Sequence, residues 1–238
     1  MAKYQYKFDK NNCLYKDICL DFNTENCSSV CERYIIMSFL LHHSQIPMKH
    51  RVRRILQVPE QDSNAYANLQ NIRKNITRFV QDGNNLYIFS PYKHNGKTSW
   101  AVSLMLKYFD EIWHSCGFTI KGVFVSVPMF LMKCKNVMSN PDIEFEQFKQ
   151  TIRTADLVIW DDIATSKLSQ YDIGVLYAYI SERMVNGKSN IYVGNLGKEE
   201  MFNCLGSNLA SCICSNLYPV RFNAGEWRDE NDFITNIK

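Results

Sequence analysis

Hydrophobic and polar positions follow two alternating periods along most of this chain. Short apolar runs typical of buried strands alternate with longer segments whose apolar residues have helical spacing. Strands are predicted at 86–89, 122–127, 157–161, 190–194 and 218–223, and helices at 97–114, 129–138, 145–154 and 168–185, with helical turns through residue 214. This alternation predicts an α/β domain in which helices flank a parallel sheet.

Two more helices are predicted before the first strand. One covers residues 31–43 and is stopped by the following Gln45-Ile46-Pro47. The other covers residues 63–81 and is stopped by Asp82-Gly83-Asn84. We therefore divide the chain into a small cysteine-rich domain, residues 1–48, and an α/β domain, residues 49–238. The basic run of Lys49, Arg51, Arg53 and Arg54 between them fits either contact with nucleic acid or nucleotide, or a solvated connector.

A phosphate-binding loop is predicted directly after the first strand. The sequence S-P-Y-K-H-N-G-K-T approaches the pattern G-x-x-x-x-G-K-[ST], with Pro91 at the first glycine position. Backbone N–H groups at a helix start bind phosphate oxygens, Lys97 would contact the β- and γ-phosphates, and Thr98 would ligate Mg²⁺. The predicted nucleotide-binding residues are Ser90, Tyr92, Lys93, His94, Asn95, Gly96, Lys97, Thr98 and Ser99, together with Asp161.

Acidic residues end the strand at 157–161. Asp161 and Asp162 follow Leu157-Val158-Ile159-Trp160, about 60 residues after the loop. Because parallel strands deliver their carboxyl ends to one edge, Asp161 is expected beside the phosphate loop as a Mg²⁺ ligand. Asp162 is expected to polarise the attacking water. The alternative is that the two acids only cap a core strand. Combined with Lys97 and Thr98, the pattern predicts binding of ATP or a related nucleotide.

Composition is consistent with a packed protein. Hydrophobic residues make up 46% of the chain and charged residues 21%, and the net charge of +3 is too small to indicate nucleic-acid binding by itself. No apolar run reaches membrane-spanning length and the N-terminus is polar, so we expect a cytoplasmic protein that does not bind membranes.

Four of the nine cysteines are clustered in the N-terminal segment. Cys13, Cys19, Cys27 and Cys31 could close a tetrahedral Zn²⁺ site and stabilise a segment too small for its own core. Two alternatives remain: scattered reduced thiols, or His42 or His43 in place of one thiolate. The other five cysteines are expected to fill core positions.

Asn195 follows the strand at 190–194, where a polar side chain could orient water and contact the γ-phosphate; a turn-forming role is the alternative. With this residue, the motifs resemble the AAA+ domain of the DnaC/DnaI family of bacterial and phage helicase loaders, to which the IstB transposition ATPases are related. The resemblance rests on residues 85–100, Trp160-Asp161-Asp162-Ile163, Arg183 before residues 191–195, and Val220-Arg221-Phe222 leading to Gly225-Glu226-Trp227-Arg228. The cysteine-rich start, with Cys31-Glu32-Arg33-Tyr34, is similar to phage-encoded members from Gram-positive hosts.

The resemblance implies an ATP-dependent protein that binds the hexameric replicative helicase through its N-terminal domain and delivers it to single-stranded DNA, with self-association as a further expectation. Apolar residues of Tyr34–Leu41 are expected to contact the helicase if that face is exposed. Alternatives are an IstB-like ATPase acting on duplex DNA and an ATP-binding adaptor with little hydrolysis.

One position departs from the family pattern. The arginine finger expected in Leu205–Ile213 is replaced by Cys212, and no arginine occurs between Arg183 and Arg221. Such an arginine contributes about 10³–10⁵ in rate. We therefore expect slow turnover, with Asp162 and Asn195 as catalytic residues and Arg183 or Arg228 as substitutes for the finger.

Overall fold

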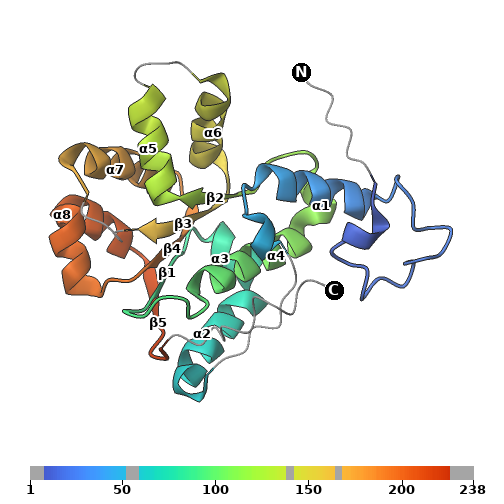
Figure 1. The fold of residues 1–238 in the computed structure, drawn as a ribbon, viewed down its shortest axis with the longest axis horizontal. Helices are drawn as coiled ribbons and strands as arrows, with labels where there is room; N and C mark the ends of the chain where they lie inside the picture. Colours follow the sequence, from blue (N-terminus) through green and yellow to red (C-terminus); the bar gives the residue numbers. More distant parts are fainter. Residues whose placement is uncertain (1–7, 52–58, 138–141, 164–167, 226–238) are drawn as a thin grey trace.

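The computed structural model describes residues 8–51, 59–137, 142–163 and 168–225. Its centre is a parallel sheet with the strand order β2-β3-β4-β1-β5. The strands are β1 (Asn85–Phe89), β2 (Gly122–Ser126), β3 (Leu157–Ile163), β4 (Ser189–Gly194) and β5 (Leu217–Arg221). The predicted strands and the α/β class are therefore confirmed, and the carboxyl ends of β1, β3 and β4 lie at one edge of the sheet (Figure 1).

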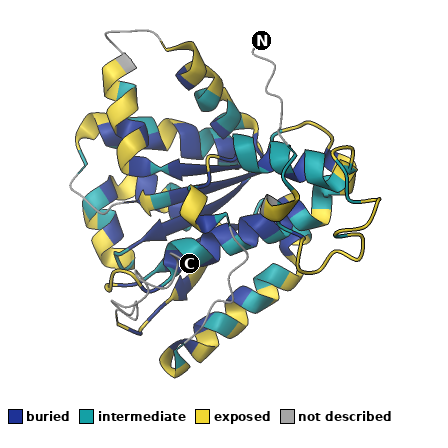
Figure 2. Cartoon of the chain, turned by 45° about the vertical axis from the view of Figure 1, so that its right-hand side comes forward, coloured by how far each residue is buried: buried dark blue, intermediate teal, exposed yellow. Residues whose placement is uncertain are grey.

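Helices cover both faces of the sheet. On one face lie α5 (Val127–Val137), α6 (Ile143–Thr154), α7 (Gln170–Val185) and α8 (Lys198–Cys214), and the other is covered chiefly by α4 (Lys97–Cys116). Successive residues of β1 enter different cores: Leu86 and Ile88 pack with α4, whereas Tyr87 packs with α7 and α8. Figure 2 shows the strands as the buried layer between these helices.

The N-terminal third adds shorter elements around α4. These are η1 (Lys10–Asn12), α1 (Glu32–His43), η2 (Met48–His50), η3 (Glu60–Asp62), α2 (Ser63–Lys74) and α3 (Ile76–Gln81). The single helix predicted at 63–81 is divided at Asn75, whose side-chain amide donates to the Asn71 carbonyl oxygen at 3.0 Å. Such side-chain bonds to the backbone compete with helical geometry and explain the break.

Helix α1 packs against the sheet domain. Ile36, Met37 and Leu40 are buried in the same core as α4. The backbone N–H of Phe124 in β2 donates to the carbonyl oxygen of Ser44, directly after α1, at 2.7 Å. The apolar face of α1 therefore packs inside the molecule. The predicted contact with a helicase required this face to be exposed, and it is buried. Among the described helices, none combines the length and the apolar character needed to cross a bilayer.

Candidate nucleotide-binding site

The loop between β1 and α4 is held together by polar side chains. Gly96 has a φ of 86° immediately before the first residue of α4, a left-handed conformation that glycine adopts without strain. Asn95 is buried, and its side-chain amide donates to Ser90 Oγ at 2.7 Å, which ties the two ends of the loop. Pro91 is exposed on this loop. The Ser90–Asn95 bond thus supports a loop that lacks the first glycine of the usual pattern.

Lys97 extends its ammonium into this loop. Its Nζ donates to the Tyr92 carbonyl oxygen at 2.6 Å and to Asn95 Oδ1 at 2.9 Å. Burial lowers the pKa of Lys97 to about 8, although Asp162 and Asp161 favour its charged form. The two oxygens that accept from Lys97 in this structure are neutral. Negatively charged phosphate oxygens would therefore form stronger hydrogen bonds with its ammonium group.

Thr98 and Asp161 meet across the carboxyl edge of the sheet. Thr98 Oγ1 donates to Asp161 Oδ1 at 2.9 Å, which joins the first turn of α4 to β3. Burial raises the pKa of Asp161 to about 6, and repulsion from Asp162 adds to the rise, whereas Thr98, Lys49 and Lys97 oppose it. A hydroxyl and a carboxylate at this separation are the oxygen ligands that Mg²⁺ prefers, so these residues fit a nucleotide-bound magnesium ion.

These groups line one pocket of about 580 Å³, large enough for a nucleotide. Ser90 does not line it but supports the loop through Asn95, and Tyr92 stands outside with 49% of its surface exposed. The predicted residues that line the pocket are Lys93, His94, Asn95, Gly96, Lys97, Thr98, Ser99, Asp161, Asp162 and Asn195. The lining also includes residues not predicted from the motifs, namely Pro47, Lys49, His50, Phe124, Ser126 and Val193.

Asp162 occupies an irregular point of β3. Its φ is 60°, and the pairing of β3 with β4 shifts between Trp160 and Ile163. A non-glycine residue in this region is uncommon and is typical of functional positions. Asp162 borders both the large pocket and a second pocket of about 260 Å³ between α5 and α7. It therefore lies between the candidate nucleotide pocket and the helices α5 and α7.

Known proteins were compared with the chain at the levels of sequence and structure. No family model and no curated protein matches the sequence. Among solved structures, the DnaC helicase loader aligns with a TM-score of 0.58 and 18% identity over 70% of this chain and 92% of that chain. DnaI aligns with a TM-score of 0.62 and 13% identity, covering 74% of this chain and 94% of that one.

The replication initiator DnaA bound to AMPPCP and single-stranded DNA aligns with a TM-score of 0.58 and 13% identity over 75% of this chain and 52% of that chain. The chain shares its fold with DnaC, DnaI and DnaA. The likeness to DnaC and DnaI confirms the resemblance noted in the sequence, and at these identities it establishes the fold alone.

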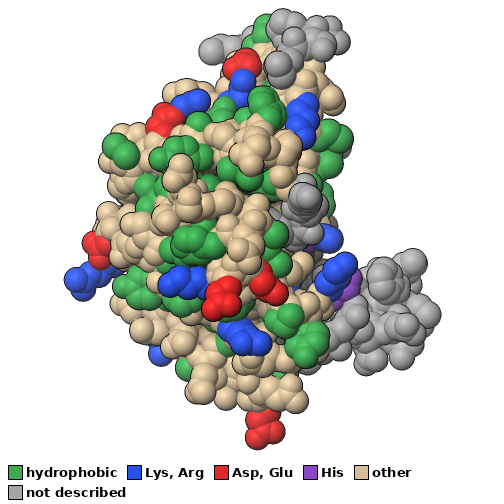
Figure 3. Space-filling view, turned by 90° about the vertical axis from the view of Figure 1, so that its left-hand side faces the viewer, with side chains coloured by type: hydrophobic (Ala, Val, Ile, Leu, Met, Phe, Trp, Pro, Cys, Tyr) green, Lys and Arg blue, Asp and Glu red, His purple; other side chains and the backbone are tan. Residues whose placement is uncertain are grey.

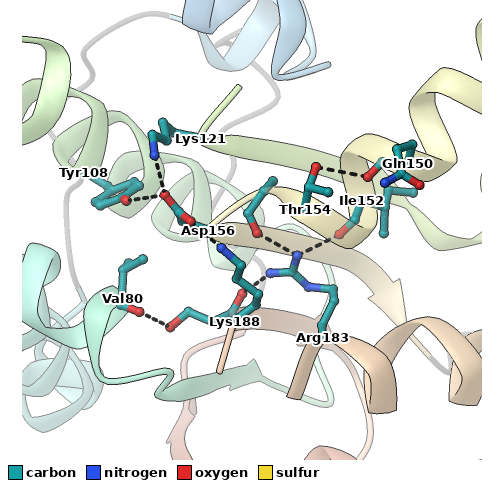
Figure 4. A network of polar contacts seen from close by, with 11 residues as sticks. Val80, Tyr108, Lys121, Gln150, Ile152, Thr154, Asp156, Arg183 and Lys188 are labelled. Carbon is teal, nitrogen blue, oxygen red and sulfur yellow. Dashed lines mark hydrogen bonds and ion pairs between the residues drawn. The ribbon is translucent and has the colours of Figure 1, made fainter. Parts of the chain in front are cut away.

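Arg183 does not reach the candidate nucleotide pocket. Its side chain is fully buried at the opposite edge of the sheet, where it donates to the carbonyl oxygens of Ile152, Ala155 and Ser189 and to Asn190 Oδ1 at 2.6–2.8 Å. Figure 4 shows the guanidinium of Arg183 turned toward Ile152. Burial lowers its pKa to about 9. The prediction that Arg183 replaces the arginine finger is therefore wrong, because all these contacts are structural. Arg228, the other proposed substitute, lies outside the described residues.

Cys212, at the expected finger position, is also part of the packing. It is half-buried on α8, and its Sγ lies 3.4 Å from Met184 Sδ on α7. Burial raises the pKa of this thiol, so it carries no charge at neutral pH. The position thus supplies neither a cation nor an extended side chain.

The predicted zinc site is not supported by the described cysteines. No three His, Cys, Asp or Glu residues in the described part of the chain lie close enough to hold a metal, so Cys13, Cys19, Cys27 and Cys31 are not gathered. Tyr15 fixes the segment instead: it is 3% exposed, its hydroxyl is hydrogen-bonded to Asp110 on α4, and the Arg33 guanidinium lies 3.6 Å from its ring centroid. The docked ring of Tyr15 thus ties this segment to α4.

Proposed function

We propose that this chain is an ATP-binding loader of the DnaC/DnaI type, which binds the hexameric replicative helicase and delivers it to single-stranded DNA. The observation that carries the proposal is the convergence of Lys97, Thr98 and Asp161 on one pocket in a fold shared with DnaC and DnaI. Two of these side chains come from α4 and the third from β3, so the fold itself assembles the site.

In this proposal each side chain has a distinct task at the nucleotide. Lys97 would exchange its bonds to Tyr92 and Asn95 for bonds to the phosphates, while N–H groups at the start of α4 bind other phosphate oxygens. Thr98 and Asp161 would hold Mg²⁺, which when bound neutralises phosphate charge. Asp162 and Asn195, both lining the pocket, would orient water near the terminal phosphate.

Hydrolysis is expected to be slow. The half-buried Cys212 supplies no positive charge to a neighbouring nucleotide, and Arg183 is confined to the opposite edge of the sheet. These two observations also favour a second candidate, an ATP-binding adaptor in which nucleotide acts as a switch with little or no turnover. Single-turnover hydrolysis of ATP, measured at concentrations where the wild-type protein is saturated with nucleotide, separates the two candidates. A slow ATPase converts the bound ATP to ADP, whereas such an adaptor leaves it intact.

The segment before α1 offers a surface for the helicase. It forms one end of the molecule (Figure 1), and three of its apolar residues are exposed: Ile18 at 62%, Leu20 at 97% and Val30 at 79%. Apolar side chains gathered on an exposed loop are typical of protein contacts. We assign the helicase contact to this loop rather than to the buried face of α1.

Surfaces for DNA and for further copies of the chain would lie elsewhere. Tyr92 on the phosphate loop has an exposed ring that can stack on a base, and Lys93 beside it is exposed. The face formed by α7 and α8, seen in Figure 3, has hydrophobic side chains spread among small groups of charges. The exposed Tyr171 and Tyr177 belong to α7 and suit self-association on this face.

Co-elution with the hexameric helicase in size-exclusion chromatography, with and without ATP and Mg²⁺, tests the loader proposal. We expect a stable complex that depends on nucleotide, and we expect Lys97→Ala to remove that dependence. Lys74→Ala, a change of an exposed lysine at the end of α2, is the matched control and should behave as wild type. No complex under any nucleotide condition would reject the loader and redirect the search to transposase partners and duplex DNA.

A further inference from the structure

The turn after α1 brings a third lysine, beside Lys93 and Lys97, to the candidate nucleotide pocket. Lys49 lies in η2, which follows Pro47, and the Arg51 side chain closes the turn by donating from Nε to the Ile46 carbonyl oxygen at 2.7 Å. His50 is only 7% exposed, and the preceding chain is bonded to β2 through Ser44 and Phe124. The backbone around Lys49 is thus fixed from both sides and does not behave as a free connector.

Lys49 is near the acidic end of the pocket. It lines the pocket together with Lys97 and Asp161, and its positive charge lowers the pKa of Asp161. Lys49 is exposed and forms no hydrogen bond or ion pair with another described residue. Its ammonium is therefore available to a ligand in the pocket.

The position of Asp161 indicates which part of a nucleotide Lys49 would contact. Asp161 is paired with Thr98, and together they would hold the Mg²⁺ that neutralises phosphate charge when a nucleoside triphosphate is bound. A cation close to Asp161 consequently lies at the phosphate end of the nucleotide and not at its base.

We propose that Lys49 is a phosphate-binding residue of this pocket, which contacts the terminal phosphate of ATP from within the same chain. The inference rests on the proposed nucleotide binding and adds a specificity for triphosphate over diphosphate. It also couples the N-terminal segment to the nucleotide, since η2 directly follows α1 and Ser44. Loss of the terminal phosphate would remove the charge-assisted contact between the ligand and Lys49, while Pro47 and His50 still line the pocket.

Equilibrium binding of AMPPCP and of ADP, both with Mg²⁺, tests the assignment by isothermal titration calorimetry. Lys49→Ala should weaken AMPPCP binding about tenfold or more and ADP binding by less than about threefold, because a charge-assisted hydrogen bond to one phosphate is lost. Lys49→Arg should retain most of the AMPPCP affinity, since it keeps the charge. Lys74→Ala should change neither affinity.

The outcomes separate this inference from the proposed function. If wild type binds both nucleotides and Lys97→Ala weakens both, nucleotide binding stands; equal effects of Lys49→Ala on AMPPCP and ADP, or no effect, then overturn the assignment of Lys49 alone. If wild type binds neither nucleotide, both proposals fail. Circular dichroism melting of each variant identifies unfolding, and a folded Lys49→Arg that loses AMPPCP as fully as Lys49→Ala also overturns the assignment.

Discussion

Thr98 Oγ1 donates a hydrogen bond to Asp161 Oδ1 at 2.9 Å, between residues 63 positions apart in the chain. The bond joins the start of α4 to the end of β3, so the two groups best suited to hold magnesium are positioned by the two elements that carry the motifs. It also partly compensates the burial of the Asp161 carboxylate, whose pKa nevertheless remains raised at about 6. A buried acid that resists ionisation is a cost to folding that binding of a cation can offset.

Asp161→Asn should therefore separate stability from binding. The variant is expected to lose at least tenfold in Mg²⁺-dependent AMPPCP affinity, because a carboxylate ligand is removed. Without nucleotide it should be more stable than wild type at pH 7 by about 1–3 kcal/mol, since a shift of about two pKa units is relieved. Urea unfolding and calorimetry measure the two effects. Asp82→Asn, on the exposed end of α3, should change neither.

The stability difference between wild type and Asp161→Asn should depend on pH in a defined direction. Because the folded-state pKa of Asp161 is raised above its ordinary value of 3.8 to about 6, the folded protein binds more protons than the unfolded chain between these values. Wild type should thus lose stability relative to the variant as pH rises from about 4 to about 6, and the difference should be constant above about 7. An opposite slope in urea unfolding at these pH values would contradict the assigned cause.

Arg183 is predicted to be a folding residue. Arg183→Met leaves the carbonyl oxygens of Ile152, Ala155 and Ser189 without their donor, and should lower the free energy of unfolding by about 3–5 kcal/mol. The AMPPCP affinity of the folded fraction should be unchanged, because the residue lies at the edge of the sheet away from Lys97. Arg153→Met removes an ion pair with Glu182 in which the two side chains are 35% and 38% exposed, and should cost about 1 kcal/mol or less. A loss of nucleotide affinity in folded Arg183→Met would restore a role at the site.

The strands and the shape of the candidate phosphate loop were predictable because their signals are local. Apolar runs such as Leu157–Trp160 are buried on both faces of a parallel sheet, and the order strand, loop, Lys97, Thr98 specifies a helix start beside the pocket. Motif spacing was sufficient to bring Asp161 to the same edge. The polar ends of strands are therefore well predicted even when the first glycine of the loop is replaced by Pro91.

The remaining features depend on contacts between distant segments. Nothing near Arg183 in the sequence reveals that four oxygen atoms at the far edge of the sheet surround it. Lys49 stood in a basic run that fitted a solvated connector equally well, and its place in the pocket follows from the bond between Ser44 and Phe124. The docking of Tyr15 on α4 has no signature in the sequence, whereas the clustered cysteines suggested a metal.

Gly194 should be intolerant of a side chain. A Cβ there would lie 2.8 Å from the Tyr87 hydroxyl oxygen and 2.9 Å from the Ile163 carbonyl oxygen, and the residue directly precedes Asn195. Gly194→Ala is expected to lower the free energy of unfolding by about 1–3 kcal/mol through overpacking. Gly174→Ala on α7 meets nothing within 4 Å and should be neutral or stabilising by up to about 1 kcal/mol, because alanine favours the helix. Equal effects of both changes on urea unfolding would contradict the steric argument.

The N-terminal segment should be held by Tyr15 and not by a metal. Tyr15→Ala removes a buried ring, its hydroxyl bond to Asp110 and its contact with Arg33, and should cost about 2–4 kcal/mol. Hydrogen exchange should increase first in the segment before α1. Cys19→Ser, at an exposed thiol, should leave unfolding unchanged.

Treatment of wild type with a zinc chelator should likewise leave its melting temperature unchanged, because the four thiols are not gathered. Stoichiometric zinc whose removal unfolds the segment would instead establish the cysteines as its anchor.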